Sequence, residues 1–559
     1  MLTSTKTGTF RFVLVAVLML LLQACQAGEE TTPAGANAGD ETSTTASGTQ
    51  TRSDEGGTDG RGGTLVVAMT AGNVPLPDIV PTEGSEGRRF VTYQLYDGLV
   101  RWDLSRDDAT SVPRPGLAES WDISEDMMTW TFHLREGVKF HDGTDWNADA
   151  AVFGLDRILN QESEWYSASL GGAIATYTKK IDSYEKIDDY TLAIHMKEPY
   201  ALLHWDLTWV RFASPDAVKT YGNDGYIQHP VGTGPFRFVS MEQGVNMILE
   251  PNTEYWGEVP KLDQLILRPM PEASSRLAAL QTGEVNWAEV PPPESMEMLR
   301  QEGFQVLLNN YPHMWPIILN LQVEPWDNKL VRQAANYAID RDGMANDLLG
   351  GAANPAVQFM YEGHDWYSED GTTYSYDPEK AKELLAEAGY PDGFETVFVV
   401  PSSGSGNMWP LPMIEFLQQN LAEVGIDVEV EVMEWGALIQ TYRPGFPPGE
   451  NVGGVMVSTG SYAPMHAFDR NFASTSVPPA GNNKGLYDNQ RVDELLREVQ
   501  VASEEEFIPL MKELNSIVTD DAPWLFVVHD LNLRVVASNV KGVVMAQNWF
   551  IDLDTVWVE

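Results

Sequence analysis

The side chains best suited to chemistry in this sequence are aromatic and small polar residues at predicted strand ends. Trp409 closes the segment 401–409, which is rich in Ser and Gly. Trp435 follows an alternating apolar segment, and Ser458 and Tyr462 follow another apolar run. A flat aromatic ring can stack on a sugar ring or on an apolar side chain. These residues therefore favour recognition of a solute, with a packing role as the alternative for each.

A predicted βαβ unit would bring these residues together. Residues 394–400 form a predicted strand, 411–424 a helix that ends at Gly425, and 426–432 a second strand in which Val and Ile alternate with acids. Such a unit is right-handed, and ligands of open α/β sheets bind outside the carboxyl ends of the strands. A third strand is predicted at 455–457. We therefore expect the residues named above at one sheet edge.

The sequence contains no motif that points to catalysis or to a metal. It has no phosphate-binding Gly-rich loop ending in Lys-Ser/Thr, no His-Glu-x-x-His pair and no Gly-x-Ser-x-Gly elbow. The nine histidines are scattered singly, so we expect no metal site and no cofactor. A secreted glycoside hydrolase remains the alternative, because two carboxylates across a cleft would suffice and the chain has 81 acids.

Length and charge limit the possible classes. With 559 residues, the chain should form two or more domains. Its 36 basic and 81 acidic side chains give a formal net charge of -45. Nucleic acid is therefore not an expected partner, because phosphate contacts require clustered Lys and Arg. The acidity is instead expected to serve solubility.

The N-terminus predicts export. Lys6 and Arg11 precede an apolar run from Phe12 to Leu22, which is too short to span a bilayer but suits a signal peptide. The following Leu22-Gln23-Ala24-Cys25 resembles a bacterial lipobox, although Gln23 is a less usual choice. We expect a signal peptide at 1–24 and a lipid on Cys25. The alternative is a plain signal peptide with an incidental cysteine.

A tether is expected after the cysteine. Residues 26–63 contain no Val, Ile, Leu, Met or aromatic residue, so they cannot bury enough apolar surface to offset their ordering entropy. We expect residues 25–63 to be a lipidated, disordered tether. Folded structure should begin with the apolar strand 64–69.

The segment 115–153 predicts a small α+β layer. Trp130, Phe132 and Leu134 alternate with polar residues, and the alternation resumes at Val138 and Phe140, which predicts a hairpin. A helix is then predicted with Asn147 as its N-cap. We expect the tryptophans of this segment to serve packing: Trp121, Trp130 and Trp146.

Four motifs stand out in this chain. The longest lies in the segment 115–153 and combines Leu117-Ala118-Glu119-Ser120-Trp121, Phe132-His133-Leu134-Arg135 and Gly137-Val138-Lys139-Phe140-His141-Asp142-Gly143. The others are Tyr96-Asp97-Gly98-Leu99-Val100, Val231-Gly232-Thr233-Gly234-Pro235-Phe236 and the segment 330–342. These motifs resemble those of solute-binding family 5, the extracytoplasmic peptide-, nickel- and oligosaccharide-binding proteins of ATP-binding-cassette importers. The resemblance extends from about Gly63 to the C-terminus.

The resemblance implies an α/β fold of the two-lobed, class II periplasmic-binding-protein type, with an extra α+β subdomain in the first lobe. Lobe I would comprise residues 64–310 and 529–559, and the subdomain residues 105–227. Lobe II would comprise residues 311–528. The crossover between the lobes would then lie near Trp315 and Asn320, which we add to Asn73, in the loop after the first strand, as candidate ligand-binding residues.

The resemblance also implies a function without catalysis. The protein would be a monomer that captures an oligopeptide- or oligosaccharide-sized solute between its lobes and delivers it to a membrane permease. Peptide-binding members tend to carry a Trp-x-x-Asp-Tyr type segment, whose Asp pairs with the peptide ammonium group, where this chain has 457–461 and no acid before Asp469. This departure and the supply of tryptophan favour an oligosaccharide over a peptide.

Overall fold

The structure is a computed structural model that describes residues 60–559 apart from 81–83, 405–407, 461 and 480. The predicted signal peptide, Cys25 and the predicted tether up to residue 59 lie outside the described residues. Within the described part, no helix is long and apolar enough to cross a membrane. The described residues belong to one compact unit.

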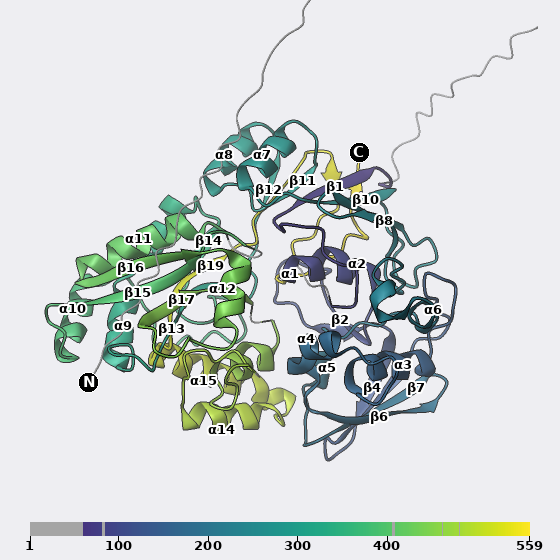
Figure 1. Ribbon diagram of the computed structural model, residues 1–559, viewed down its shortest axis with the longest axis horizontal. Coiled ribbons are helices and arrows are strands. Elements are labelled where there is room, and N and C mark those ends of the chain that lie inside the picture. Colours follow the sequence, from purple (N-terminus) through teal and green to yellow (C-terminus); the bar gives the residue numbers. More distant parts are fainter. Residues whose placement is uncertain (1–59, 81–83, 405–407, 461, 480) are drawn as a thin grey trace, which may run out of the picture. The chain divides into compact units, whose positions relative to one another are not determined.

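The first large sheet has seven strands in the order β12-β20-β11-β1-β10-β9-β8. The predicted strand 64–69 is confirmed as β1 (Thr64–Met69), which pairs in parallel with β10 and β11. The other strands are β8 (Phe236–Glu242), β9 (Asn246–Pro251), β10 (Gln264–Pro269), β11 (Trp287–Glu289), β12 (Gln305–Leu307) and β20 (Arg534–Val536). The short helices α7 (Ala273–Gln281) and α8 (Met296–Gln301) connect strands of this sheet (Figure 1).

The second large sheet contains the predicted βαβ unit. β15 (Phe394–Pro401) and β16 (Ile426–Met433) are parallel neighbours, and α11 (Pro410–Glu423) connects them and packs on both. β17 (Val452–Met456) is also parallel to β15. The carboxyl ends of these three strands therefore share one edge, as the sequence predicts. The sheet continues through β13 (His313–Leu319), β19 (Trp524–Asp530) and β14 (Ala353–Pro355), and β18 (Thr459–Gly460) pairs with β13.

The chain passes twice between the two sheets. It crosses from β12 to β13 at 308–312 and returns from β19 to β20 at 531–533. We use lobe I for the residues that accompany the first sheet and lobe II for those that accompany the second. The division at 310/311 and 528/529 stays a prediction. The first boundary falls between the sheets and the second inside β19, where His529 and Asp530 still pair with β14.

A four-stranded antiparallel sheet lies within the predicted subdomain, in the order β4-β5-β7-β6. The predicted hairpin is wrong: β5 (Thr129–Leu134) pairs with β4 (Ala118–Ile123) and β7 (Thr191–Met196), not with 138–140. Val138 and Phe140 alternate because both are buried in the core, while the backbone there turns tightly at Gly137, whose φ is +76°. Alternation marks burial on one face, and it does not choose the partner strand.

The helix after this turn forms as predicted. It is α3 (Ala148–Leu159), and the Asn147 side chain accepts a hydrogen bond from the Ala150 N–H at 3.1 Å. Trp130 and Trp146 are fully buried, as a packing role requires. The other elements of this region are β6 (Ile181–Asp188), α4 (Ala168–Thr178), α5 (Leu203–Leu207) and α6 (Pro215–Tyr226).

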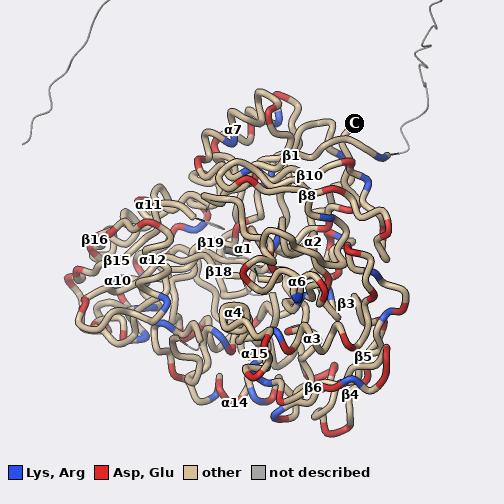
Figure 2. Tube along the Cα trace, turned by 45° about the vertical axis from the view of Figure 1, so that its right-hand side comes forward, with Lys and Arg blue, Asp and Glu red and all other residues tan. Residues whose placement is uncertain are grey.

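Helices also cover the sheet of lobe II (Figure 1). α10 (Pro378–Glu387) follows the N-cap Asp377, whose side chain accepts from the Lys380 N–H, and Gly389 follows its end at a φ of +95°. The further helices are α9 (Lys329–Tyr337), α12 (Trp435–Tyr442), α14 (Gln490–Val499) and α15 (Glu504–Asp521). Acidic residues are spread over the outer elements of both lobes (Figure 2).

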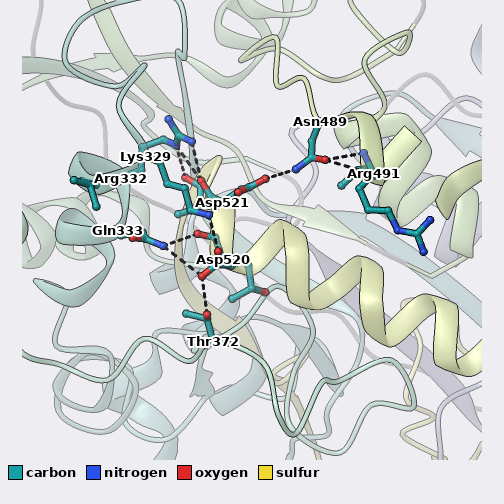
Figure 3. A network of polar contacts seen from close by, with 12 residues as sticks. Lys329, Arg332, Gln333, Thr372, Asn489, Arg491, Asp520 and Asp521 are labelled. Carbon is teal, nitrogen blue, oxygen red and sulfur yellow. Dashed lines mark hydrogen bonds and ion pairs between the residues drawn. The ribbon is translucent and has the colours of Figure 1, made fainter. Parts of the chain in front are cut away.

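A polar network holds the C-terminus of α15 against α9 (Figure 3). Asp521 accepts hydrogen bonds from Lys329 Nζ at 2.8 Å, Tyr487 Oη at 2.5 Å and Asn489 Nδ2 at 2.6 Å. Burial alone would raise the pKa of Asp521, but these hydrogen bonds outweigh burial and leave the pKa below its usual value. A negative charge is unfavourable at a helix C-terminus, so the neighbouring donors are what stabilises it there.

Replacement of Asp521 should destabilise the protein in a pH-dependent manner. We expect Asp521→Asn to lower the free energy of unfolding by about 1–3 kcal/mol at pH 7, because three donors lose a charged acceptor. The folded-state pKa is depressed, so the stabilisation is complete above the unfolded pKa of about 3.9 and is lost as pH falls through the folded pKa. Urea unfolding from pH 7 to pH 3 measures both effects.

The matched control is Glu369→Gln, which removes an exposed carboxylate paired with Lys512. Its unfolding midpoint should stay close to that of the wild type. Equal destabilisation by both variants would contradict the account of the network.

Candidate functional site

The sheet edge predicted from the sequence gathers three of the candidate residues. Trp409 precedes α11, Trp435 opens α12, and Ser458 follows β17. All three are half-buried. Neither Trp409 nor Trp435 makes a ring contact with another aromatic residue in the described part of the chain. Their role in binding stays a prediction.

Asn73, Trp315 and Asn320 are engaged within the fold. Asn73 Oδ1 accepts from the Gly244 N–H at 2.7 Å and so joins the loop after β1 to the turn between β8 and β9. Asn320 Nδ2 donates to the Val452 carbonyl at 3.1 Å. Trp315 lies on β13 and is fully buried. The structure does not bring these three residues together, and their role in binding also stays a prediction.

Tyr462 lies in a different environment, a cluster of aromatic side chains between the lobes. We call it the inter-lobe aromatic cluster; it contains Tyr93, Trp102, Tyr311, Tyr462, Trp549 and Phe550, with Trp209 packed against it. The Trp209 ring lies 6.2 Å from that of Tyr462 and 5.7 Å from that of His466. Trp209 follows α5 in lobe I, whereas Tyr462 and His466 belong to lobe II. Rings from both lobes therefore face each other.

Trp209 occupies the centre of this cluster. Its ring is 5.3 Å from Phe550 and 4.9 Å from Tyr177 of α4, with which it is stacked at 9°. Phe550 is stacked in turn on Tyr93 at 4.9 Å. The lobe I side of the site is thus built from α4, from the segment after α5, and from the C-terminal segment that follows β20.

Basic side chains border the cluster on both lobes. Arg88, in the π-helical segment η1 (Arg88–Thr92), lies with its guanidinium carbon 5.1 Å from the Trp209 ring centre. The Arg211 guanidinium lies 4.8 Å from the Tyr93 ring centre. Together they line a pocket with about 270 Å³ of empty space that Trp209 and Phe550 also border. Such cation–π contacts partly offset the cost of burying a cation.

Lobe II contributes two further cations. Arg470 begins the short helix α13 (Arg470–Phe472), and its Nη1 lies 2.6 Å from His466 Nε2. Lys484 donates to Asn482 Oδ1. Burial, reinforced by Arg470, lowers the pKa of Lys484 to about 7. Burial also lowers the pKa of Arg211 and of Arg470.

A second pocket lies beside the strands that join the lobes and has about 350 Å³ of empty space. Glu289 lines this pocket, and its carboxylate is held in place because Arg89 Nη1 and Arg534 Nε both donate to it. All three side chains are almost completely buried. Asp530 is held in the same way by His313 Nδ1 at 2.5 Å.

Glu86 borders the same pocket and forms no ion pair with a described residue. Its carboxylate accepts from the Thr70 N–H, the Thr70 hydroxyl and the Ala71 N–H at 2.7–2.9 Å. Burial, with Glu289 nearby, raises the pKa of Glu86. Within the described residues, no group of His, Cys, Asp and Glu could hold a metal ion.

The lobes are also joined by polar contacts beside the aromatic cluster. Lys179 Nζ, just after α4, lies 2.8 Å from Asp469 Oδ2 in lobe II. The Ala201 N–H donates to the Gln500 carbonyl at 2.7 Å.

The sequence pattern does not single out Trp209, Arg88 or Arg211 as site residues. One signal was present: the segment 205–212 combines two tryptophans and an arginine with apolar neighbours. The Arg211 side chain is buried and is therefore expected to have a partner. Only the fold shows that these residues face lobe II.

Comparison with known proteins places this geometry in context. Residues 112–469 match the bacterial extracellular solute-binding proteins, family 5. The chain is 35% identical over 438 residues to a glutathione-binding protein of Pectobacterium atrosepticum, covering 76% of this chain and 81% of that protein. It is 31% identical over 489 residues to heme-binding protein A of Haemophilus influenzae, covering 81% and 85%.

A solved structure has the same fold. It is the ABC transporter-associated periplasmic binding protein DppA from Helicobacter pylori in complex with the peptide STSA. The TM-score is 0.77 and the identity is 28%, with 89% of this chain and 98% of that chain covered. The prediction of a two-lobed α/β fold is confirmed.

Removal of the Glu289 carboxylate should strongly destabilise the protein. We expect Glu289→Ala to lower the free energy of unfolding by about 3–5 kcal/mol, because it leaves Arg89 and Arg534 buried and without their shared acceptor. Urea unfolding followed by circular dichroism measures the loss.

Glu284→Ala serves as the control, since Glu284 forms an exposed pair with Arg268. Its effect should be much smaller. If Glu289→Ala cost less than the control, the carboxylate would not be what holds the two arginines.

Proposed function

The chain belongs to family 5 of the bacterial extracellular solute-binding proteins, and we propose that it captures a peptide- or oligosaccharide-sized solute between its lobes for the permease of an ATP-binding-cassette importer. One observation carries this proposal: the ring of Trp209 in lobe I lies against the rings of Tyr462 and His466 in lobe II. Aromatic rings from two bodies can enclose a small solute that neither body could hold alone.

Capture would proceed by closure of the lobes. A solute favours the closed arrangement only as far as it makes more contacts there than in an open one. The ion pair of Lys179 with Asp469 would stabilise the closed arrangement. The segments 308–312 and 531–533, which connect the lobes, would bend during closure.

Two classes of solute fit this proposal. The relatives named for glutathione and for dipeptides, and the peptide in the Helicobacter pylori structure, support a small peptide. The aromatic surfaces also suit a sugar ring, and this is the basis of the oligosaccharide hypothesis.

We place the protein outside the cytoplasm as a monomer, attached to the membrane by a lipid on Cys25. The apolar run from Phe12 to Leu22 and the position of Cys25 as the one cysteine of the chain support this placement. The glycoside hydrolase alternative has less support, because Glu289 and Asp530 are already bound to Arg89, Arg534 and His313.

Mass spectrometry of small molecules released from the natively purified protein tests solute capture. We expect one solute class in an amount close to that of the protein. The identified solute should quench tryptophan fluorescence saturably, reduce the radius of gyration in small-angle X-ray scattering and stay chemically unchanged. Steady turnover of the solute would support the hydrolase instead, and binding without compaction would contradict closure.

Loss of the inter-lobe ion pair should weaken solute binding. We expect Lys179→Gln to raise the dissociation constant of the identified solute by less than about tenfold, because the pair is partly exposed. Titration calorimetry measures the change, and Lys186→Gln, at an ion pair within the subdomain, is the control. An equal effect of the two variants would contradict a role of Lys179 in closure.

The lipid anchor has its own test. Cys25→Ala should move the protein from the membrane fraction to the soluble extracytoplasmic fraction, because it removes the one residue that can receive the lipid. Immunoblotting of the fractions measures the shift. Retention of the variant in the membrane would contradict the anchor and leave solute capture unaffected.

A further inference from the structure

We propose that the inter-lobe site takes a solute with at least two oxyanion groups, carboxylates or phosphates, which are held by Arg88 and Arg211 of lobe I and by Arg470 and Lys484 of lobe II. We call these four side chains the inter-lobe cations. The inference rests on the proposed function and adds the charge class of the solute to it.

The inter-lobe cations have no acidic partner in the described part of the chain, where none of them forms an ion pair. Arg211 is the clearest case, because its side chain is buried and its Nη2 has no hydrogen-bond partner among the described residues. Asp97 lies near enough to influence Arg211. However, it already accepts from the Thr233 hydroxyl, the Tyr255 hydroxyl and Trp256 Nε1.

The acids beside the cluster are also engaged. Asp469 is bound to Lys179. Asp206 accepts from the Tyr200 hydroxyl at 2.5 Å, and burial raises the pKa of Asp206 to about 7. Among the described residues, no acid therefore forms an ion pair with any of the four inter-lobe cations, all of which are buried or half-buried.

Neutral donors around the cluster lack acceptors as well. Trp102 Nε1, Trp209 Nε1 and the Tyr93 hydroxyl are buried and have no hydrogen-bond partner among the described residues. An indole N–H and a guanidinium can only donate. Oxyanions supply several acceptor sites each, so a solute that carries them would satisfy the cations and the neutral donors together.

The arrangement of the cations implies more than one oxyanion. Arg88 and Arg211 line one pocket beside Trp209, on the lobe I side of the cluster. Arg470 reaches the same ring from lobe II through His466, which is stacked on Trp209. Lys484 lies close enough to Arg470 for the charge of Arg470 to lower the pKa of Lys484. A solute with one negative charge could neutralise either the lobe I pair, Arg88 and Arg211, or the lobe II pair, Arg470 and Lys484, but not both.

The test uses tricarballylate and pyrophosphate as probes, with propane-1,2,3-tricarboxamide as the uncharged analogue and sodium chloride at matched ionic strength. We expect at least one polyanion to raise the melting temperature of the full chain in a saturable manner. Its apparent affinity should be at least tenfold above that of propionate, which carries a single carboxylate and serves as the monoanion control. The two polyanions distinguish a carboxylate from a phosphate preference. The amide should have no effect.

Arg211→Gln and Arg88→Gln should each reduce the affinity for the polyanion at least tenfold. Without a probe, Arg211→Gln should melt at or above the temperature of the wild type, because it removes a buried charge that forms no ion pair with a described residue. A structural role of Arg211 would give the opposite result. Arg491→Gln, at an exposed cation bound by Glu498 and Glu513, is the matched control and should respond to the probes as the wild type does.

Three outcomes would overturn the proposal: no response to either polyanion, an equal response to the amide, or an equal loss in Arg211→Gln and Arg491→Gln. If a neutral solute is released from the native protein while the polyanions fail, the charge assignment is wrong and solute capture stands. If no solute is released and no probe binds, both proposals fail.

Discussion

Positive charge buried between the two lobes is the constraint on which the functional interpretation of this structure depends. A buried cation is costly unless it is paired, and the fold shows a paired case only a few residues away. Arg89 and Arg534 share the Glu289 carboxylate, and this arrangement holds lobe I together where the chain returns from lobe II. Arg88, adjacent to Arg89 in sequence, faces the other lobe and has an aromatic ring instead of an acid. A cation paired with a buried acid stabilises the fold, whereas a cation without an acidic partner is available to bind the proposed solute.

The elements predicted from the sequence are those whose pattern is local. The strand at 64–69, the βαβ unit at 394–432 and the Asn147 cap depend on neighbours a few residues away, so periodicity and capping rules found them. The hairpin failed because β5 pairs with β7, about sixty residues later. Spacing within one segment contains no information about that partner.

The site was harder to predict than the fold, for the same reason. Tyr462 could be named from the sequence because it follows the third predicted strand, which lies beside the βαβ unit. The rings packed against Trp209 include those of His466 and Phe550, which lie more than 250 residues further along the chain. The motifs of the segment 115–153 identify the family, yet its fully buried residues Trp130 and Trp146 serve packing. What identifies the family and what forms the candidate site are therefore different parts of the chain.

The most direct test of the central claim is a crystal structure of the protein purified with its natural solute. The account predicts electron density between Trp209 and Tyr462, with two oxyanion groups of the solute within hydrogen-bond distance of Arg211 on one side and Arg470 on the other. Density for a neutral solute at this place, or for an anionic solute bound away from both arginines, would contradict it.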